Sequence, residues 1–129
     1  MKTQTLGKSR LVSSRLSYGC MRISGTWDPA SYTPKLEAEG KKAVLAAVDA
    51  GYTLFDHADI YGMGLCETLF GKVLKENPGL RKTPLVFLTA VVNKDELGAP
   101  EGKIGGEMYI AKPLNVKGVI SVIERTLGK

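Results

Sequence analysis

The stretch from Gly51 to Gly62, GYTLFDHADIYG, constrains the fold more than any other part of the chain. Gly51 follows a helical pattern, at a position where a left-handed backbone suits glycine best. Residues 52–55 have the aromatic, β-branched and leucine content of a buried strand. The polar side chains that follow are Asp56, His57, Asp59 and Tyr61. Parallel α/β folds place their chemistry at such strand ends, so the stretch predicts a functional site.

Two amphipathic helical patterns flank this strand. Thr33 and Pro34 are a typical N-cap and first helical residue, so the first helix should begin there. Its apolar face consists of Leu36, Gly40, Ala43, Val44, Ala47 and Val48. The apolar face of the second helix consists of Leu65, Leu69, Phe70, Val73 and Leu74. Asn77-Pro78-Gly79 is expected to end that helix.

Length and composition indicate one soluble globular domain of 129 residues. The net charge is +5, but no basic run is interleaved with aromatic residues, so we expect no nucleic-acid partner. The spacing of Cys20 and Cys66 matches neither a metal-binding motif nor a redox motif, so we expect reduced thiols. Reduced thiols indicate a cytoplasmic protein, and we expect this one to be recombinantly expressed. We expect no contact with a membrane, because no apolar run reaches the length of a span. A complete (βα)8 barrel needs about 250 residues, which this chain does not provide alone.

The pattern D-x-A-x-x-Y-G extends from Asp56 to Gly62, and GMGLCETLFGKVLK continues as the next helix. On these residues the segment 1–80 resembles the aldo-keto reductases, which fold as TIM barrels. The resemblance implies that Asp56 orients a lysine and that Tyr61 donates a proton to the substrate carbonyl. The end of the first strand, residues 19–22, is also similar to the strand end that approaches the nicotinamide in that family.

The chain departs from this family in its second half. Ala90 stands where the next strand should deliver the catalytic lysine, and Lys94 comes several residues too late. His57 is the only histidine, so the family's later histidine is missing as well. We therefore expect Asp56 and Tyr61 to be inactive remnants, and the chain to be no enzyme and to bind no cofactor.

The second half contains the runs TPLVFLTA, GGEMYIAKP and LNVKGVISVIERTL. With these runs the segment 81–129 resembles the last two βα units of a response-regulator receiver domain. The resemblance implies that Thr89 is a switch hydroxyl and that Lys112, before a cis Pro113, contacts a phosphoryl group. The acidic pair that holds magnesium in receivers is absent, so we do not expect Asp56 to be phosphorylated well. We expect at most an adventitious phosphate or sulfate near Thr89 and Lys112.

We interpret residues 1–129 as a single hybrid domain. Parallel strands are expected, in the order 1-2-3-4, over 16–21, 53–56, 85–89 and 108–111. A hairpin made of residues 2–6 and 11–13 should lie at one edge, and a final helix over 115–128, capped by Asn115, should cross to the other face. The expected fold is a flavodoxin-like three-layer α/β/α sandwich, either a monomer or a weak dimer through its sheet edges.

The preferred functional interpretation is an engineered chimera of TIM-barrel and flavodoxin-like fragments, without activity and without a specific partner. The alternative is a degenerate or truncated aldo-keto reductase that retains weak NADP(H) binding, and a third option is a receiver-like signalling module. His57 is expected to form hydrogen bonds at the strand end. A metal site made of Asp56, His57 and Asp59 would need a further ligand, so we expect none. Gly62-Met63-Gly64 could cradle an anion before the second helix, although such glycines usually serve the turn.

Overall fold

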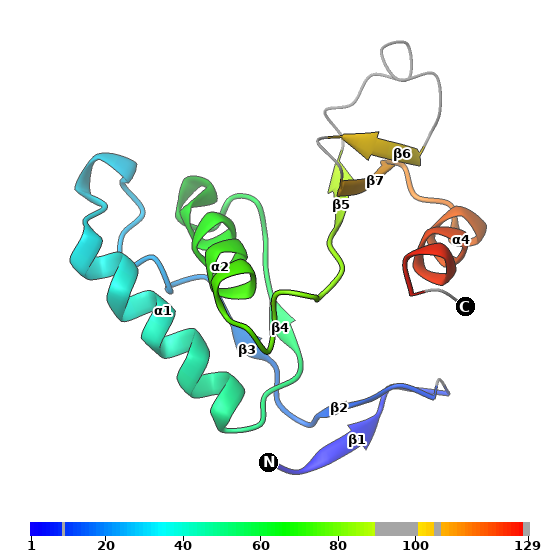
Figure 1. Cartoon of the computed structure of the whole chain (residues 1–129), viewed down its shortest axis with the longest axis horizontal. Coiled ribbons are helices and arrows are strands. Elements are labelled where there is room, and N and C mark those ends of the chain that lie inside the picture. Colours follow the sequence, from blue (N-terminus) through cyan, green and yellow to red (C-terminus); the bar gives the residue numbers. More distant parts are fainter. Residues whose placement is uncertain (9, 90–100, 105–106, 128–129) are drawn as a thin grey trace. The chain divides into compact units, whose positions relative to one another are not determined.

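The computed structural model of the chain describes residues 1–8, 10–89, 101–104 and 107–127. These residues belong to two compact units, Met1–Lys82 and Thr83–Lys129, which we call unit 1 and unit 2 (Figure 1). The division follows Lys82 and so lies close to the junction expected after residue 80. That the whole chain forms a single hybrid domain stays a prediction.

Unit 1 contains a hairpin, a pair of parallel strands and two α-helices. The hairpin joins β1 (Thr3–Thr5) to β2 (Val12–Ser14), and the parallel pair consists of β3 (Tyr18–Gly19) and β4 (Phe55–Asp56). The α-helices are α1 (Pro34–Asp49) and α2 (Leu65–Glu76), and the 3-10 turns η1 (Pro29–Ser31) and η2 (Tyr61–Gly64) precede them. The predicted hairpin, helices and parallel neighbours are confirmed, but the two core strands are shorter than expected.

Local signals in the sequence determine where α1 begins and ends. The Thr33 side chain accepts a hydrogen bond from the Leu36 N–H at 3.3 Å, and Pro34 occupies the first turn. Gly51 adopts φ +88° just after the helix, a conformation that costs glycine little and other residues more. The chain can therefore turn directly from α1 into the approach to β4.

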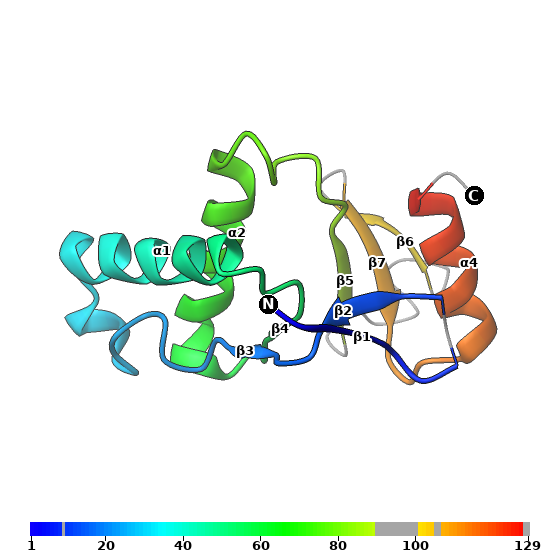
Figure 2. The same cartoon turned by 90° about the horizontal axis from the view of Figure 1, so that it is seen from below.

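The core of unit 1 lies between the helices and one face of the β3–β4 pair. Figures 1 and 2 show α1 and α2 next to each other beside this pair. The buried side chains of the core are Cys20, Ile23, Val44, Cys66, Leu69 and Val73. Aromatic rings extend it, since Phe55 lies 5.8 Å from Tyr18 and 5.2 Å from Phe70 between ring centroids. Most of the stabilisation comes from this burial, because two-residue strands form few ladder hydrogen bonds.

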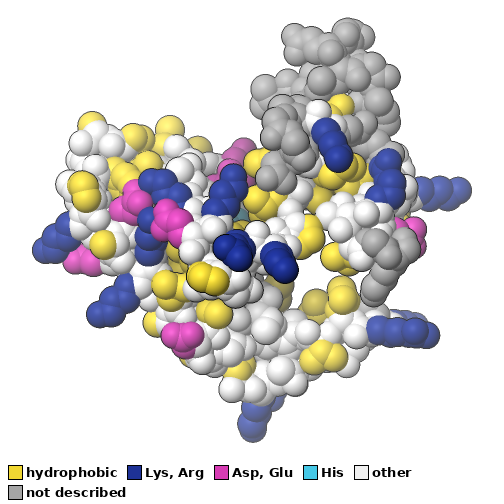
Figure 3. Space-filling view, viewed as in Figure 1, with side chains coloured by type: hydrophobic (Ala, Val, Ile, Leu, Met, Phe, Trp, Pro, Cys, Tyr) yellow, Lys and Arg dark blue, Asp and Glu magenta, His cyan; other side chains and the backbone are white. Residues whose placement is uncertain are grey.

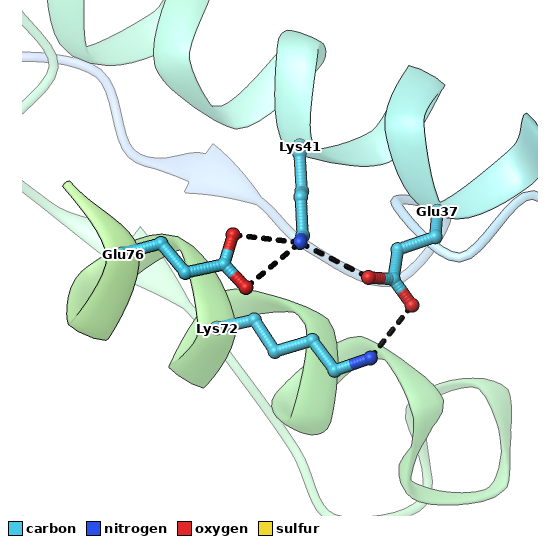
Figure 4. A network of polar contacts seen from close by, with 4 residues as sticks. All are labelled: Glu37, Lys41, Lys72 and Glu76. Carbon is cyan, nitrogen blue, oxygen red and sulfur yellow. Dashed lines mark hydrogen bonds and ion pairs between the residues drawn. The ribbon is translucent and has the colours of Figure 1, made fainter. Parts of the chain in front are cut away.

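Charged side chains join the exposed sides of α1 and α2, where Figure 3 shows acidic and basic groups intermixed. Lys41 Nζ lies 3.0 Å from Glu37 Oε1 and 2.7 Å from Glu76 Oε2, and Lys72 Nζ lies 2.7 Å from Glu37 Oε2 (Figure 4). The hydrogen bond from Lys72, followed by that from Lys41, lowers the pKa of Glu37. A single ion pair on the surface contributes little stability, but this network links the two helices and fixes which side of each helix faces the other.

The described residues of unit 2 form three strands and one helix. They are β5 (Val86–Thr89), β6 (Glu101–Ile104), β7 (Glu107–Ala111) and α4 (Val116–Leu127). The sheet order is β5-β7-β6, in which β5 is parallel and β6 antiparallel to β7. Helix α4 packs against β7 and contributes the fully buried Val122 to a core that includes Tyr109 and Ile110. The expected parallel neighbours 85–89 and 108–111 are thereby confirmed.

Two local predictions in unit 2 are confirmed and one strand was missed. The Lys112–Pro113 peptide is cis, and the Asn115 side chain accepts a hydrogen bond from the Gly118 N–H at 2.7 Å. Strand β6 was not predicted, because its sequence EGKI contains few residues that favour strands. It forms because its backbone pairs with the free edge of β7. The flavodoxin-like sandwich is not confirmed, because the described strands form three separate sheets. Within the described part of the chain, no helix combines the length and the apolar character of a membrane span.

The close approach of α1 to the core provides a test of this packing. A Cβ added to Gly40 would clash with the carbonyl oxygen of Ile23 and lie 2.6 Å from Leu69 Cδ1, whereas one added to Gly71 meets nothing within 4 Å. We expect Gly40→Ala to lower the free energy of unfolding by about 1–3 kcal/mol in urea denaturation. The matched control Gly71→Ala, on an open face of α2, should raise it by about 0.5–1 kcal/mol. Equal effects of the two substitutions would contradict the packing described.

Candidate functional site

Two of the predicted site residues meet at the carboxyl end of β4. Asp56 is the last residue of this strand, and Tyr61 begins η2 five residues later. The Tyr61 hydroxyl donates a hydrogen bond to Asp56 Oδ2 at 2.9 Å. We call these two residues the acid pair. The D-x-A-x-x-Y-G spacing therefore produces a direct contact between the carboxylate and the phenol.

The turn after β4 holds Tyr61 in this position. The Tyr61 N–H donates to the Ala58 carbonyl at 3.1 Å, and Gly62, Met63 and Gly64 then have φ of +57°, +54° and +88°. Gly62 is also packed tightly, since a Cβ there would lie 2.7 Å from Ser24 Oγ. Three successive left-handed residues turn the chain into α2 and leave the phenol beside the end of the strand.

Asp56 lies on the side of the β3–β4 pair that faces away from the unit 1 helices. Side chains alternate along a strand, so Leu54 and Asp56 point to one face while Phe55 points to the helices. Asp56 is exposed, and so are Leu54 and the neighbouring Gly19, which is in register with Asp56. Two hollows are described on unit 1, of about 450 and 240 Å³; neither is lined by Asp56 or Tyr61, and the smaller one includes Gly19. The Asp56 carboxylate is thus on open surface, and Tyr61 is half-buried, with its ring packed against the unit 1 core.

Asp56 makes it harder for Tyr61 to ionise. The hydrogen bond to the carboxylate, followed by the carboxylate charge, raises the pKa of Tyr61 above its ordinary value. A phenolate would lose the donated hydrogen bond and would also face a negative charge. The phenol is therefore held in its protonated form, which is the form that can donate a proton.

The two cysteines contribute to packing next to the site. Both are buried and free, as the reduced-thiol expectation requires. The Cys66 Sγ lies 3.3 Å from Ser24 Oγ and 3.5 Å from the Met21 carbonyl oxygen. Burial, and then the nearby Asp56 and Cys66 charges, raise the pKa of Cys20 to about 12. A thiol with so high a pKa is a poor nucleophile at neutral pH.

The prediction made for His57 was wrong. It was expected to form hydrogen bonds at the strand end, but its two ring nitrogens are buried and have no hydrogen-bond partner among the described residues. The ring packs instead against Phe70, with centroids 4.4 Å apart. Burial lowers the pKa of His57, because the charged imidazolium would lose its hydration. In the described part of the chain, no three His, Cys, Asp or Glu side chains gather into a possible metal site.

The second predicted pair, Thr89 and Lys112, lies in unit 2. Thr89 is in register with Ala111 across the parallel β5–β7 ladder, so its backbone lies at the same sheet end as exposed Lys112. The phosphate or sulfate expected there stays a prediction. Ala90 and Lys94, which decided the sequence argument about the catalytic lysine, lie outside the described residues.

Comparison with known proteins identifies the family. Residues 15–104 match the aldo/keto reductase family, and the chain belongs to this family. It is 37% identical over 101 residues to Probable aldo-keto reductase 1 of Glycine max, covering 78% of this chain and 27% of that protein. It is 41% identical over 69 residues to the uncharacterized oxidoreductase YcsN of Bacillus subtilis (strain 168), covering 54% and 21%. A 6-dehydroglucose reductase of Novosphingobium aromaticivorans is 37% identical over 83 residues, covering 60% and 25%.

These comparisons overturn the prediction that the chain is not an enzyme. The chain belongs to the aldo/keto reductase family, and the relatives that it matches carry reductase or oxidoreductase names, which speaks against that prediction. The chain spans about a quarter of the length of the curated relatives it matches. The matched region also continues to residue 104, beyond the limit of 80 that the sequence analysis set for the reductase-like segment.

His57 gives a test of the packing beneath the site. Because its folded pKa is lowered, the stability that it contributes is present above its unfolded pKa and is lost as the pH falls. We expect His57→Phe to stabilise the fold by about 1 kcal/mol at neutral pH, since it removes two unsatisfied buried nitrogens. The difference in melting temperature between variant and wild type should widen from pH 7 to pH 5. A constant difference over that range would contradict this assignment.

Proposed function

We propose that this chain is the proton-donating part of an aldo-keto reductase, in which Tyr61 protonates the oxygen of a substrate carbonyl. The 2.9 Å hydrogen bond between Tyr61 and Asp56, inside the region that matches the family, is the observation that carries this proposal. A general acid must keep its proton at neutral pH and must reach the substrate. Asp56 helps Tyr61 to keep its proton, and the half-buried Tyr61 is not closed off, because its hydroxyl lies beside the exposed Asp56 carboxylate.

The surface beside the acid pair suits the nicotinamide of NADP(H). Gly19 is in register with Asp56, and nothing lies within 4 Å of the position that a Cβ of Gly19 would take. A flat ring can therefore lie against this backbone, next to the acid pair. When bound, the nicotinamide supplies the hydride of the reduction. Gly19 would keep the surface open for it, Asp56 would orient the phenol, and Tyr61 would supply the proton.

The chain provides only part of the catalytic machinery that the family resemblance implies. Ala90 follows β5 where the resemblance leads us to expect a lysine, and the chain spans about a quarter of its relatives. We therefore propose that full activity needs groups from outside this segment, and that the isolated chain binds NADP(H) weakly.

The test combines cofactor binding with turnover. NADPH should raise the melting temperature of the chain in a saturable manner, because a ligand that binds only the folded state stabilises it. With a reactive aldehyde, any NADPH oxidation should fall by about 10²-fold or more in Tyr61→Phe, since general acid catalysis is worth that much. The matched control Tyr52→Phe should keep the wild-type rate. A flat NADPH titration over a cooperatively folded protein would refute the proposal.

We also propose that the part of unit 2 after residue 104 derives from a receiver-type fold and that the chain is a hybrid of two parents, engineered or natural. The parallel pairing of β7 with β5 and the capped α4 support this origin, while β5 and β6 lie within the aldo/keto reductase match. In the complete hybrid the strands would form the flavodoxin-like sandwich.

Limited proteolysis tests the two-unit organisation of such a hybrid. Arg81 and Lys82 are exposed and lie at the boundary between the units. Trypsin should cut there first and leave two fragments that resist further digestion, because a protease cuts exposed chain between folded units most readily. Mass spectrometry of the products identifies the cleavage sites. Simultaneous cleavage at many sites would contradict two separately folded parts.

A further inference from the structure

Helix α4 carries an apolar stripe that lies open on its surface. Its four side chains are Val116, Ile120, Ile123 and Leu127, which are 75%, 49%, 47% and 55% exposed. We call these residues the α4 stripe. The helix packs against β7 with another of its sides, on which Val122 is fully buried. Large apolar side chains gathered on one exposed surface are typical of an interaction site.

The spacing of the α4 stripe is that of a helix that pairs with another helix. Its residues follow one another at intervals of four, three and four, as contact residues do in coiled coils. These intervals keep all four side chains on one line along the helix. Because the contact with β7 already holds α4 in place, the α4 stripe is formed before any partner binds.

Two charged residues, Lys117 and Glu124, lie beside the α4 stripe. They are one heptad apart, so they share one flank of the stripe, and Val122 lies on the opposite flank. Both side chains are exposed, and within the described part of the chain neither forms an ion pair. The flank thus offers a cation and an anion that are both available to a partner.

The order of these charges matches a second copy of the same helix in the antiparallel direction. If two such helices cross between Ile120 and Ile123, Lys117 of one helix comes level with Glu124 of the other. Two-fold symmetry then places Glu124 of the first helix level with Lys117 of the second. In a parallel pair the residues that lie level are identical, so no opposite charges meet.

We propose that the α4 stripe is a self-association surface, on which a second copy of this chain docks its own α4 in the antiparallel direction. The apolar side chains of the two helices bury one another, and the two Lys117–Glu124 pairs select the direction. This surface differs from the sheet edges that the sequence suggested for a dimer, and it is separate from the proposed reductase chemistry. Two helices of 12 residues bury less area than a standard interface, so the dimer is weak.

Sedimentation velocity of the full chain, from micromolar to millimolar concentration, tests the proposal. We expect a monomer–dimer equilibrium. Ile120→Glu places a charge inside the α4 stripe and should abolish the dimer. The matched control is Ile60→Glu, at an isoleucine of unit 1 that is 55% exposed, and it should keep the wild-type dissociation constant. Circular dichroism checks that both variants are folded.

Charge reversal tests the direction of pairing and leaves the α4 stripe intact. Lys117→Glu alone, or Glu124→Lys alone, should raise the dissociation constant by about tenfold, because like charges then lie level in both pairs. The double variant, with both reversals, should return to the wild-type value.

A chain that stays monomeric at every concentration would overturn the proposal, and this is the result expected if another segment of the same chain covered the stripe. A dimer whose dissociation constant is unchanged by the single charge reversals would overturn it too. Neither NADPH nor aldehyde takes part in these measurements, so their outcome is independent of the proposed function.

Discussion

The structure of unit 1 depends on how closely α1 and α2 approach the β3–β4 pair. Each of these strands pairs over two residues, so the ladder alone would be marginal, and burial against the helices must hold it. Gly40 contributes to this packing because it lets α1 lie directly against the backbone of Ile23, in the turn that follows β3, and against Leu69 of α2. The packed strand pair then fixes the end of β4, and with it the position of Asp56. A change in the spacing between helix and strand would move the acid pair as well.

The same packing explains why Asp56 is exposed. The helices cover one face of the β3–β4 pair, and Asp56 is on the other face, beside Leu54 and Gly19. Strands of parallel sheets are normally covered on both faces, so this open face is where further protein or a ligand is expected. The chain spans about a quarter of its relatives, which agrees with a site that is completed from outside this segment. On the proposed function, Tyr61 and Asp56 are one part of a larger active centre.

Signals carried by neighbouring residues could be predicted from the sequence, and long-range arrangements could not. The Thr33 cap, the left-handed Gly51 and the cis peptide before Pro113 depend on one or two residues, and all are confirmed. The pairing of β6 and the burial of His57 depend on partners far along the chain, so the sequence missed both. The Asp56–Tyr61 bond was also missed, because it depends on a turn in which even Met63 is left-handed. The prediction that the chain is not an enzyme was wrong. It depended on the missing lysine, whereas the family match covers the region that contains the D-x-A-x-x-Y-G spacing.

The central claim is that the end of β4 and the adjoining Gly19 form part of a nicotinamide-dependent active centre. The most direct measurement is a map of backbone amide shifts on ¹⁵N-labelled chain as NADPH is added. The account predicts saturable shifts at Gly19, Asp56 and Tyr61, around the acid pair. Shifts that avoid these three amides, or no shifts at the highest concentration of NADPH that stays in solution, would contradict it.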